Sequence, residues 1–140
     1  MALSKSDVSV GQTFQQVLVD DLKRTQLVQY AGASGDYNPL HSDELFAREV
    51  AGYPTVFAHG MLTMGMTGRV LTDALGDGRL KRYGGRFTSQ VFPGDTLTAT
   101  ATVESIGEED GEPVAELTVT TTNQEGVVVF SGQATGRLDP

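Results

Sequence analysis

Residues 60–75, GMLTMGMTGRVLTDAL, constrain the fold of this chain more than any other segment. Apolar side chains occupy half of its positions, and charge occurs only at Arg69 and Asp73. A helix that lacks a polar stripe is typical of a helix buried on several sides, and Gly65 and Gly68 would let it approach a sheet closely. We therefore predict a central core helix over residues 60–75.

After this helix, the sequence changes from a helical period to an alternating one. In residues 96–104, Leu and Ala or Val alternate with Thr and Glu, as in a half-buried strand. The same alternation predicts strands at residues 115–119 and 128–134. The acidic stretch 108–112 contains Asp110-Gly111, which is a strong hairpin signal.

Two short helices are predicted before the central one. The first can be capped by Asp21 or Thr25 and ends by residues 32–35. Its apolar face comprises Leu27, Val28 and Ala31. The second begins after the cap Ser42 and continues to about Val50.

Further strands are expected at residues 13–19 and 79–90, the latter with a bulge or a close backbone approach at Gly84-Gly85. This order of elements predicts the α+β class: an antiparallel sheet of about five strands wrapped around the central helix. A chain of 140 residues is expected to form a single domain, residues 1–140.

The composition restricts the functions to consider. A formal net charge of -8 argues against nucleic-acid binding, which depends on clustered Lys and Arg. The sequence contains no cysteine, so disulfides, thiolate nucleophiles and Cys-based zinc sites are excluded. We find neither a signal-like start nor a segment apolar enough to span a membrane, and we expect a cytoplasmic protein with no membrane partner.

Asp36 and His41 lie five residues apart in the loop sequence GDYNPLH, residues 35–41. A carboxylate and an imidazole held close together can activate a water and return its proton to carbon. The residues alone leave two alternatives open. Asp after Gly and Asn38-Pro39 are also common in plain turns, and Asp36, Asn38 and His41 could supply mixed metal ligands, although no known metal motif is matched.

Gly60 stands where the central helix is expected to begin. Free backbone N–H groups at a helix start can hydrogen-bond a carbonyl oxygen that gains negative charge. The alternative is that Gly60 only permits a tight entry into the helix. For His59 we prefer a structural role, with its ring bonded to a backbone carbonyl, because its spacing provides no second acid/base partner.

Half of the basic residues fall within a short part of this acidic chain. They are Arg69, Arg79, Lys81, Arg82 and Arg86. Such residues could bind the phosphates of a substrate, or they could simply be the solvated charges that protect a strand edge.

Three segments together resemble a known family. The sequence YAGASGDYNPLH at residues 30–41, followed by Ala47, is similar to the signature of MaoC-like (R)-specific enoyl-CoA hydratases. The similarity continues through AHGML at 58–62 and FPGD at 92–95, and it covers about residues 10–105. The resemblance implies a hotdog fold, in agreement with the predicted sheet and helix.

For function, the resemblance implies hydration of a trans-2-enoyl thioester to an (R)-3-hydroxyacyl thioester, or the reverse dehydration, in fatty acid metabolism. Asp36 would be the base that activates a water toward C3, and His41 would share that water and help to deliver a proton to C2. Gly60 would bind the thioester oxygen, with Asn38 and His59 as supporting residues. Arg69, Lys81, Arg82 and Arg86 are candidates for contacts with the phosphates of CoA.

The family implies no cofactor and no metal, and a dimer, either a homodimer or a heterodimer. An acyl-CoA is the preferred substrate over an acyl carrier protein, because carrier proteins are acidic like this chain. Three alternatives stay open: a catalytic subunit of a heterodimeric 3-hydroxyacyl-ACP dehydratase, a hotdog thioesterase, and a nonenzymatic acyl-binding subunit. The sequence does not fix the acyl length. The acyl site is expected to be shaped by the Met-bearing face of the central helix and by four aromatic residues, Tyr37, Phe46, Tyr53 and Phe57.

Overall fold

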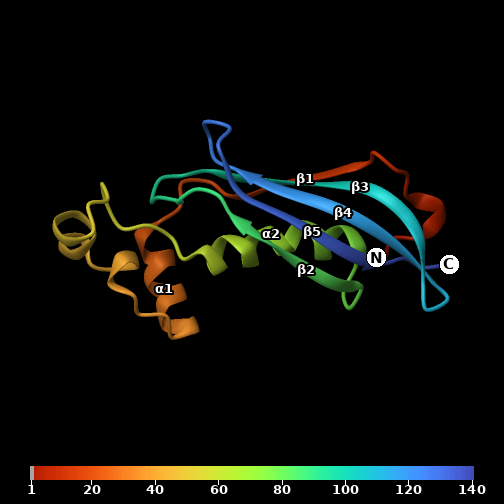
Figure 1. Ribbon diagram of the computed structural model, residues 1–140, viewed down its shortest axis with the longest axis horizontal. Coiled ribbons are helices and arrows are strands. Elements are labelled where there is room, and N and C mark those ends of the chain that lie inside the picture. Colours follow the sequence, from red (N-terminus) through yellow and green to blue (C-terminus); the bar gives the residue numbers. More distant parts are fainter. Residues whose placement is uncertain (1) are drawn as a thin grey trace.

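The computed structural model describes residues 2–140 and confirms an α+β fold (Figure 1). The five strands are β1 (Thr13–Val19), β2 (Leu80–Phe87), β3 (Leu97–Glu109), β4 (Glu112–Thr122) and β5 (Val128–Arg137). The two α-helices are α1 (Arg24–Ser34) and α2 (Gly60–Leu75). Short helical turns cover Lys5–Asp7, Pro39–His41 and Phe46–Val50.

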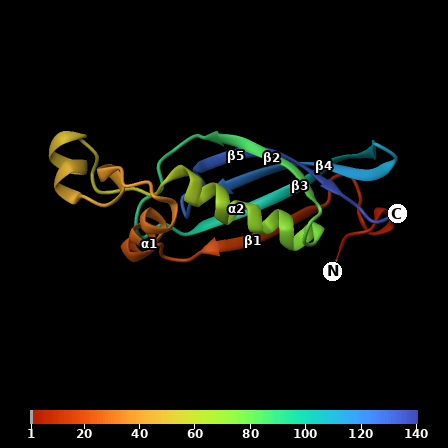
Figure 2. The same ribbon diagram turned by 90° about the horizontal axis from the view of Figure 1, so that it is seen from below.

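The strands form one antiparallel sheet in the order β1-β3-β4-β5-β2. Helix α2 runs across one face of this sheet and contacts all five strands (Figure 2). This is the predicted hotdog arrangement, with β1 and β2 as its edge strands. Helix α1 and residues 35–57 lie beyond one end of the sheet, and the chain termini lie at the other (Figure 1).

Helix α2 has the predicted bounds, but its burial is more one-sided than expected. Leu71 and Leu75 are fully buried against the sheet, and Thr67 Oγ1 hydrogen-bonds Thr121 Oγ1 at 2.6 Å within the core. On the opposite side Met61 is 57% exposed, and Arg69 is also exposed. The prediction of burial on several sides is therefore wrong for this side of α2, which the described chain leaves uncovered.

The residues that cap the two helices predicted before α2 differ from those expected. Helix α1 begins after Lys23, whose backbone N–H is bonded by the side chain of Gln26, so neither Asp21 nor Thr25 is its cap. Val28 does not share the buried face, since it is 60% exposed. Before the helical turn at Phe46–Val50, the predicted cap was Ser42. The side chain that accepts a hydrogen bond from the backbone N–H of Phe46 is instead that of Asp43.

The predicted strands are present, with some boundaries shifted. Strand β2 ends at Phe87, three residues earlier than predicted, and β3 continues beyond residue 104 into the hairpin. The Asp110-Gly111 turn has positive φ at both residues, as its sequence predicts. At Gly85 the chain makes a close backbone approach, because an added Cβ would lie 2.5 Å from Ser131 O.

No helix in the described part of the chain is both long and apolar enough to cross a membrane.

Candidate active site

The loop after α1 is folded by its own polar side chains. Helix α1 ends at Gly35, which adopts a left-handed φ of 75°. Asp36 Oδ1 then accepts a hydrogen bond from Asn38 N at 3.2 Å, and Asn38 Oδ1 accepts one from Leu40 N at 3.0 Å. These bonds start the helical turn at Pro39–His41 and leave the second oxygen of the exposed Asp36 carboxylate available to a ligand.

His41 is held in one orientation by a backbone carbonyl. Its Nδ1 lies 2.6 Å from Phe57 O, so Nδ1 carries the proton and donates it, and Nε2 is left with a lone pair. The side chain is buried, and burial lowers the pKa of His41. The hydrogen bond to the Phe57 carbonyl partly offsets this lowering of the pKa, whereas the neighbouring His59 adds to it. The resting imidazole is therefore neutral and ready to accept a proton at Nε2.

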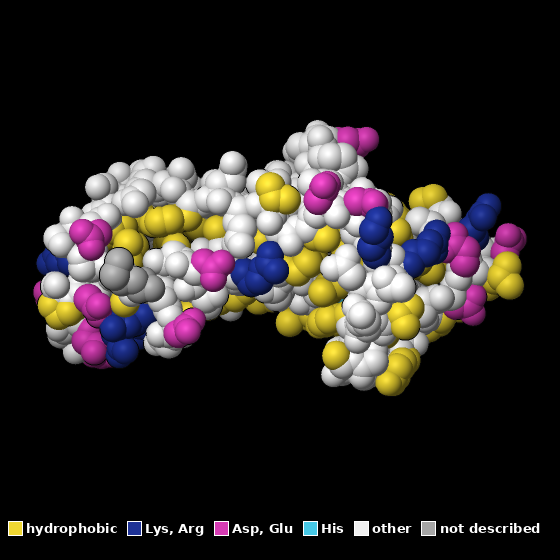
Figure 3. Space-filling view, turned by 180° about the vertical axis from the view of Figure 1, so that it is seen from behind, with side chains coloured by type: hydrophobic (Ala, Val, Ile, Leu, Met, Phe, Trp, Pro, Cys, Tyr) yellow, Lys and Arg dark blue, Asp and Glu magenta, His cyan; other side chains and the backbone are white. Residues whose placement is uncertain are grey.

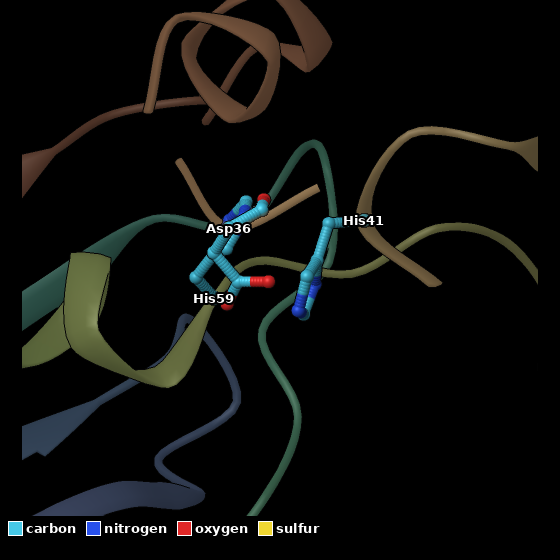
Figure 4. A group of neighbouring side chains, drawn as sticks. All are labelled: Asp36, His41 and His59. Atoms are coloured by element: carbon cyan, nitrogen blue, oxygen red, sulfur yellow. The ribbon is translucent and has the colours of Figure 1, made fainter. Parts of the chain in front are cut away.

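His59 links His41 to the loop that carries Asp36. Its Nε2 lies 2.9 Å from Asp36 O, and its ring stacks on that of His41 with centroids 3.8 Å apart. The edge of Tyr30 from α1 packs against the same ring. Figure 4 shows the three side chains Asp36, His41 and His59 gathered at one place. The contact with a backbone carbonyl agrees with the structural role preferred for His59.

The same three residues place one potential ligand atom each within 4.8 Å of one another. However, His41 Nδ1 and His59 Nε2 each bond a backbone carbonyl, so neither of these two nitrogens is available to an ion. The Nδ1 of His59 is also sealed from solvent. Asn38, which a mixed metal site would need, already uses its side-chain oxygen within the loop. Several of the atoms that a mixed metal site would need are therefore already bonded within the chain.

Gly60 is the first residue of α2, where backbone N–H groups lack partners within the helix. An added Cβ would lie 2.9 Å from the ring of Phe87, so any larger residue at this place would require that ring to move. A pocket of about 290 Å³ adjoins Gly60, with Phe57, Thr63 and Phe87 among its walls. The helix N-terminus therefore faces a space that a ligand can enter.

Three of the four candidate phosphate-binding residues already have partners within the chain, although Arg82 and Arg86 line the same broad pocket beside β2. Arg69 donates to Leu18 O at 3.0 Å, and Lys81 and Arg82 both pair with Glu109. These two cations lower the pKa of Glu109 to about 2. Arg86 is exposed, and among the described residues no carboxylate pairs with it.

The model of the MaoC-like domain family matches residues 5–126 of this chain. The chain belongs to the MaoC-like family. It is 31% identical to the (R)-specific enoyl-CoA hydratase of Aeromonas caviae over 139 residues, which are 97% of this chain and 99% of that enzyme. The solved structure of the A. caviae (R)-hydratase has a TM-score of 0.81 at 29% identity and covers 94% of this chain and 97% of its own.

A shorter match is closer in sequence. The 3-hydroxyacyl-thioester dehydratase Y of Mycobacterium tuberculosis is 48% identical over 68 residues, which are 46% of this chain and 23% of that protein. This chain spans less than a third of several of the curated relatives it matches. Several of the relatives are named enoyl-CoA hydratases or dehydratases, and others are named fatty acid synthase subunits.

Three residues that contact Asp36, His41, His59 or Gly60 were not predicted to do so. The Phe57 carbonyl fixes the ring of His41, Tyr30 packs on His59, and Phe87 covers Gly60. The segment FAHG contains a usable signal, because it places an aromatic residue and a histidine directly before a helix start. Nothing in the local sequence pairs Phe87 with Gly60, since the two residues come from different elements.

The lowered pKa of His41 predicts a stability that depends on pH. The imidazole of the unfolded chain has a pKa of about 6.5, and that of the folded chain has a lower pKa. The unfolded state therefore binds more protons as the pH falls below about 6.5, so the contribution of His41 to stability is present in full above that pH. This contribution is lost as the pH falls through the lower folded pKa. We expect the melting temperature of the wild type to fall more between neutral and acidic pH than that of His41→Asn, which cannot titrate. Parallel curves for the two proteins would contradict this expectation.

The bond from His59 to the Asp36 carbonyl predicts different effects for two substitutions. Glutamine can still donate an amide N–H toward Asp36 O, whereas leucine leaves that carbonyl without its partner. Such a loss costs about 1–3 kcal/mol when the carbonyl is buried. We expect His59→Leu to be less stable than His59→Gln by up to that amount in urea unfolding, and also less active. Equal stability and activity of the two variants would show that the bond is unimportant.

Proposed function

We propose that this protein is an (R)-specific enoyl-thioester hydratase, which adds water to trans-2-enoyl-CoA to give (R)-3-hydroxyacyl-CoA or catalyses the reverse dehydration. The observation that supports this proposal is the convergence of two proton-exchanging groups, the Asp36 carboxylate and His41 Nε2, next to the N-terminus of α2. The hydratase names of relatives that match nearly the whole chain add to this support.

In the proposed reaction, one water lies between Asp36 and His41. Asp36 takes a proton from this water as its oxygen attacks C3, and electrons move from the double bond onto the thioester oxygen. Backbone N–H at Gly60 stabilises the enolate that forms. The proton returns to C2 on the same face, through the Asp36 carboxyl group or through His41 Nε2. The hydroxyl group of the water is then on C3 and its proton is on C2 of the 3-hydroxyacyl product.

We propose CoA as the thioester carrier and Arg86 as the first of the basic residues to test for phosphate binding. Arg69, Lys81 and Arg82 already have partners within the chain. Residues 2–140 leave both edges of the sheet and the Met61 side of α2 uncovered, which supports association with a second copy of this chain. A related hotdog subunit is the alternative partner.

The direct test uses crotonyl-CoA and the purified chain alone. We expect loss of the enoyl absorbance without release of free thiol, and a 3-hydroxybutyryl product of R configuration. Thiol release would instead identify a thioesterase. An inactive chain that gains activity with a second hotdog subunit would indicate a heterodimer, and turnover of acyl carrier protein substrates alone would overturn the choice of CoA.

A further inference from the structure

We propose that the pocket beside Gly60 takes the acyl chain of a short enoyl thioester and that the ring of Phe87 limits the length of this chain. The inference rests on the proposed function, because it places the thioester oxygen at the N-terminus of α2. From that point, the acyl chain of a bound substrate can enter the adjoining pocket.

The size and lining of the pocket favour a short chain. Its volume of about 290 Å³ lies at the lower end of the range for small-molecule sites. Thr63 and Val129, both buried, belong to its walls, while Ser89 and Gln90 are exposed polar residues of the same lining. A long alkyl chain would have to displace the buried residues or lie against polar groups and solvent.

Phe87 is the wall that can change most easily. It ends the edge strand β2, the residue is 49% exposed, and an added Cβ at Gly60 would lie 2.9 Å from its ring. The neighbouring ring of Phe130, 5.6 Å away between centroids, is fully buried. Removal of the Phe87 ring would therefore enlarge the pocket toward the surface while Phe130 still closes the core.

Figure 3 shows the face of the molecule opposite to that in Figure 1, where hydrophobic side chains are exposed near the end that carries α1. Residues with exposed apolar side chains near this site include Tyr37, Met61 and Phe87. Tyr37, which the sequence placed among the residues that shape the acyl site, is 72% exposed and is not part of the pocket lining. Of the four residues expected there, Phe57 lines the pocket.

The test compares kcat/KM for crotonyl-CoA, trans-2-hexenoyl-CoA and trans-2-octenoyl-CoA in the wild type, Phe87→Leu and Phe87→Ala. We expect the wild type to prefer the shortest substrates. Each methylene that becomes buried should improve binding about fourfold, so the octenoyl-to-crotonyl ratio should rise at least about tenfold in Phe87→Ala, with Phe87→Leu between. Phe14→Ala is the matched control, since Phe14 is a partly buried phenylalanine on the opposite edge strand β1.

We expect Phe14→Ala to lower stability without changing the ratio. An unchanged ratio in Phe87→Ala, or an equal change in Phe14→Ala, would overturn the inference and leave the proposed function intact. If the wild type hydrates no enoyl-CoA, the proposed function fails, and calorimetry with butyryl-CoA and octanoyl-CoA still tests the pocket. A gain in octanoyl-CoA binding that is specific to Phe87→Ala would support the pocket, and its absence would overturn it.

Discussion

Asp36→Asn is expected to lower kcat for crotonyl-CoA hydration by about 10²–10⁴-fold, the contribution typical of a general base. The substitution removes the charge that would take a proton from water and changes little else. Asparagine keeps an Oδ1 that can accept the hydrogen bond from Asn38 N, at 3.2 Å in the wild type. The carboxylate is exposed, so no buried partner loses its counter-charge. The measurement is the steady-state rate, followed by the loss of enoyl absorbance.

Matched controls separate chemistry from folding in this experiment. Asp43→Asn changes a nearby carboxylate that bonds a helix N–H at Phe46, and it should leave the rate within a fewfold of the wild type. The melting temperature of Asp36→Asn should also stay close to that of the wild type. A near-normal rate in Asp36→Asn would contradict the proposed base, whereas loss of the fold would leave this variant unsuitable and shift the test to Asp36→Ser.

The features that the sequence could predict are those determined by local pattern. The bounds of β1 at Thr13–Val19 and of α2 at Gly60–Leu75 match the prediction, because a short apolar run such as Val17-Leu18-Val19 and a longer helical one are properties of consecutive residues. The uncovered side of α2 could not be predicted in this way. Met61 is apolar in sequence, yet it is exposed in the isolated chain, and composition cannot say which neighbour covers an apolar side chain.

In the candidate site, too, contacts between residues close in sequence could be predicted, and contacts between distant residues could not. Asp36 and His41 are close in sequence, so one loop brings them together, and this pairing could be predicted. The bonds that fix them come from farther away: Phe57 O is 16 residues from His41, and His59 is 23 residues from Asp36. Such contacts depend on how α1, the loop and the start of α2 pack against one another. Every residue has a backbone carbonyl, so the identity of residue 57 does not indicate that its carbonyl bonds His41.

His41→Asn is expected to reduce kcat by about 10²–10⁴-fold while it keeps the local structure. The asparagine amide can occupy the place of Nδ1 and donate to Phe57 O, the bond that measures 2.6 Å in the wild type. It provides no group at the position of Nε2, so the variant loses the atom that shares the water. The measurement is the rate with crotonyl-CoA, together with thermal melting to show that the fold is retained.

A comparison of His41→Asn with His41→Ala distinguishes proton exchange from support of the loop. Alanine loses both nitrogens, and the Phe57 carbonyl then loses its partner, so His41→Ala should be the less stable of the two. If His41 acts through Nε2, both variants are equally inactive despite their different stabilities. If asparagine instead restores most of the rate, His41 acts through its bond to Phe57, and Asp36 alone must then move the proton between water and C2.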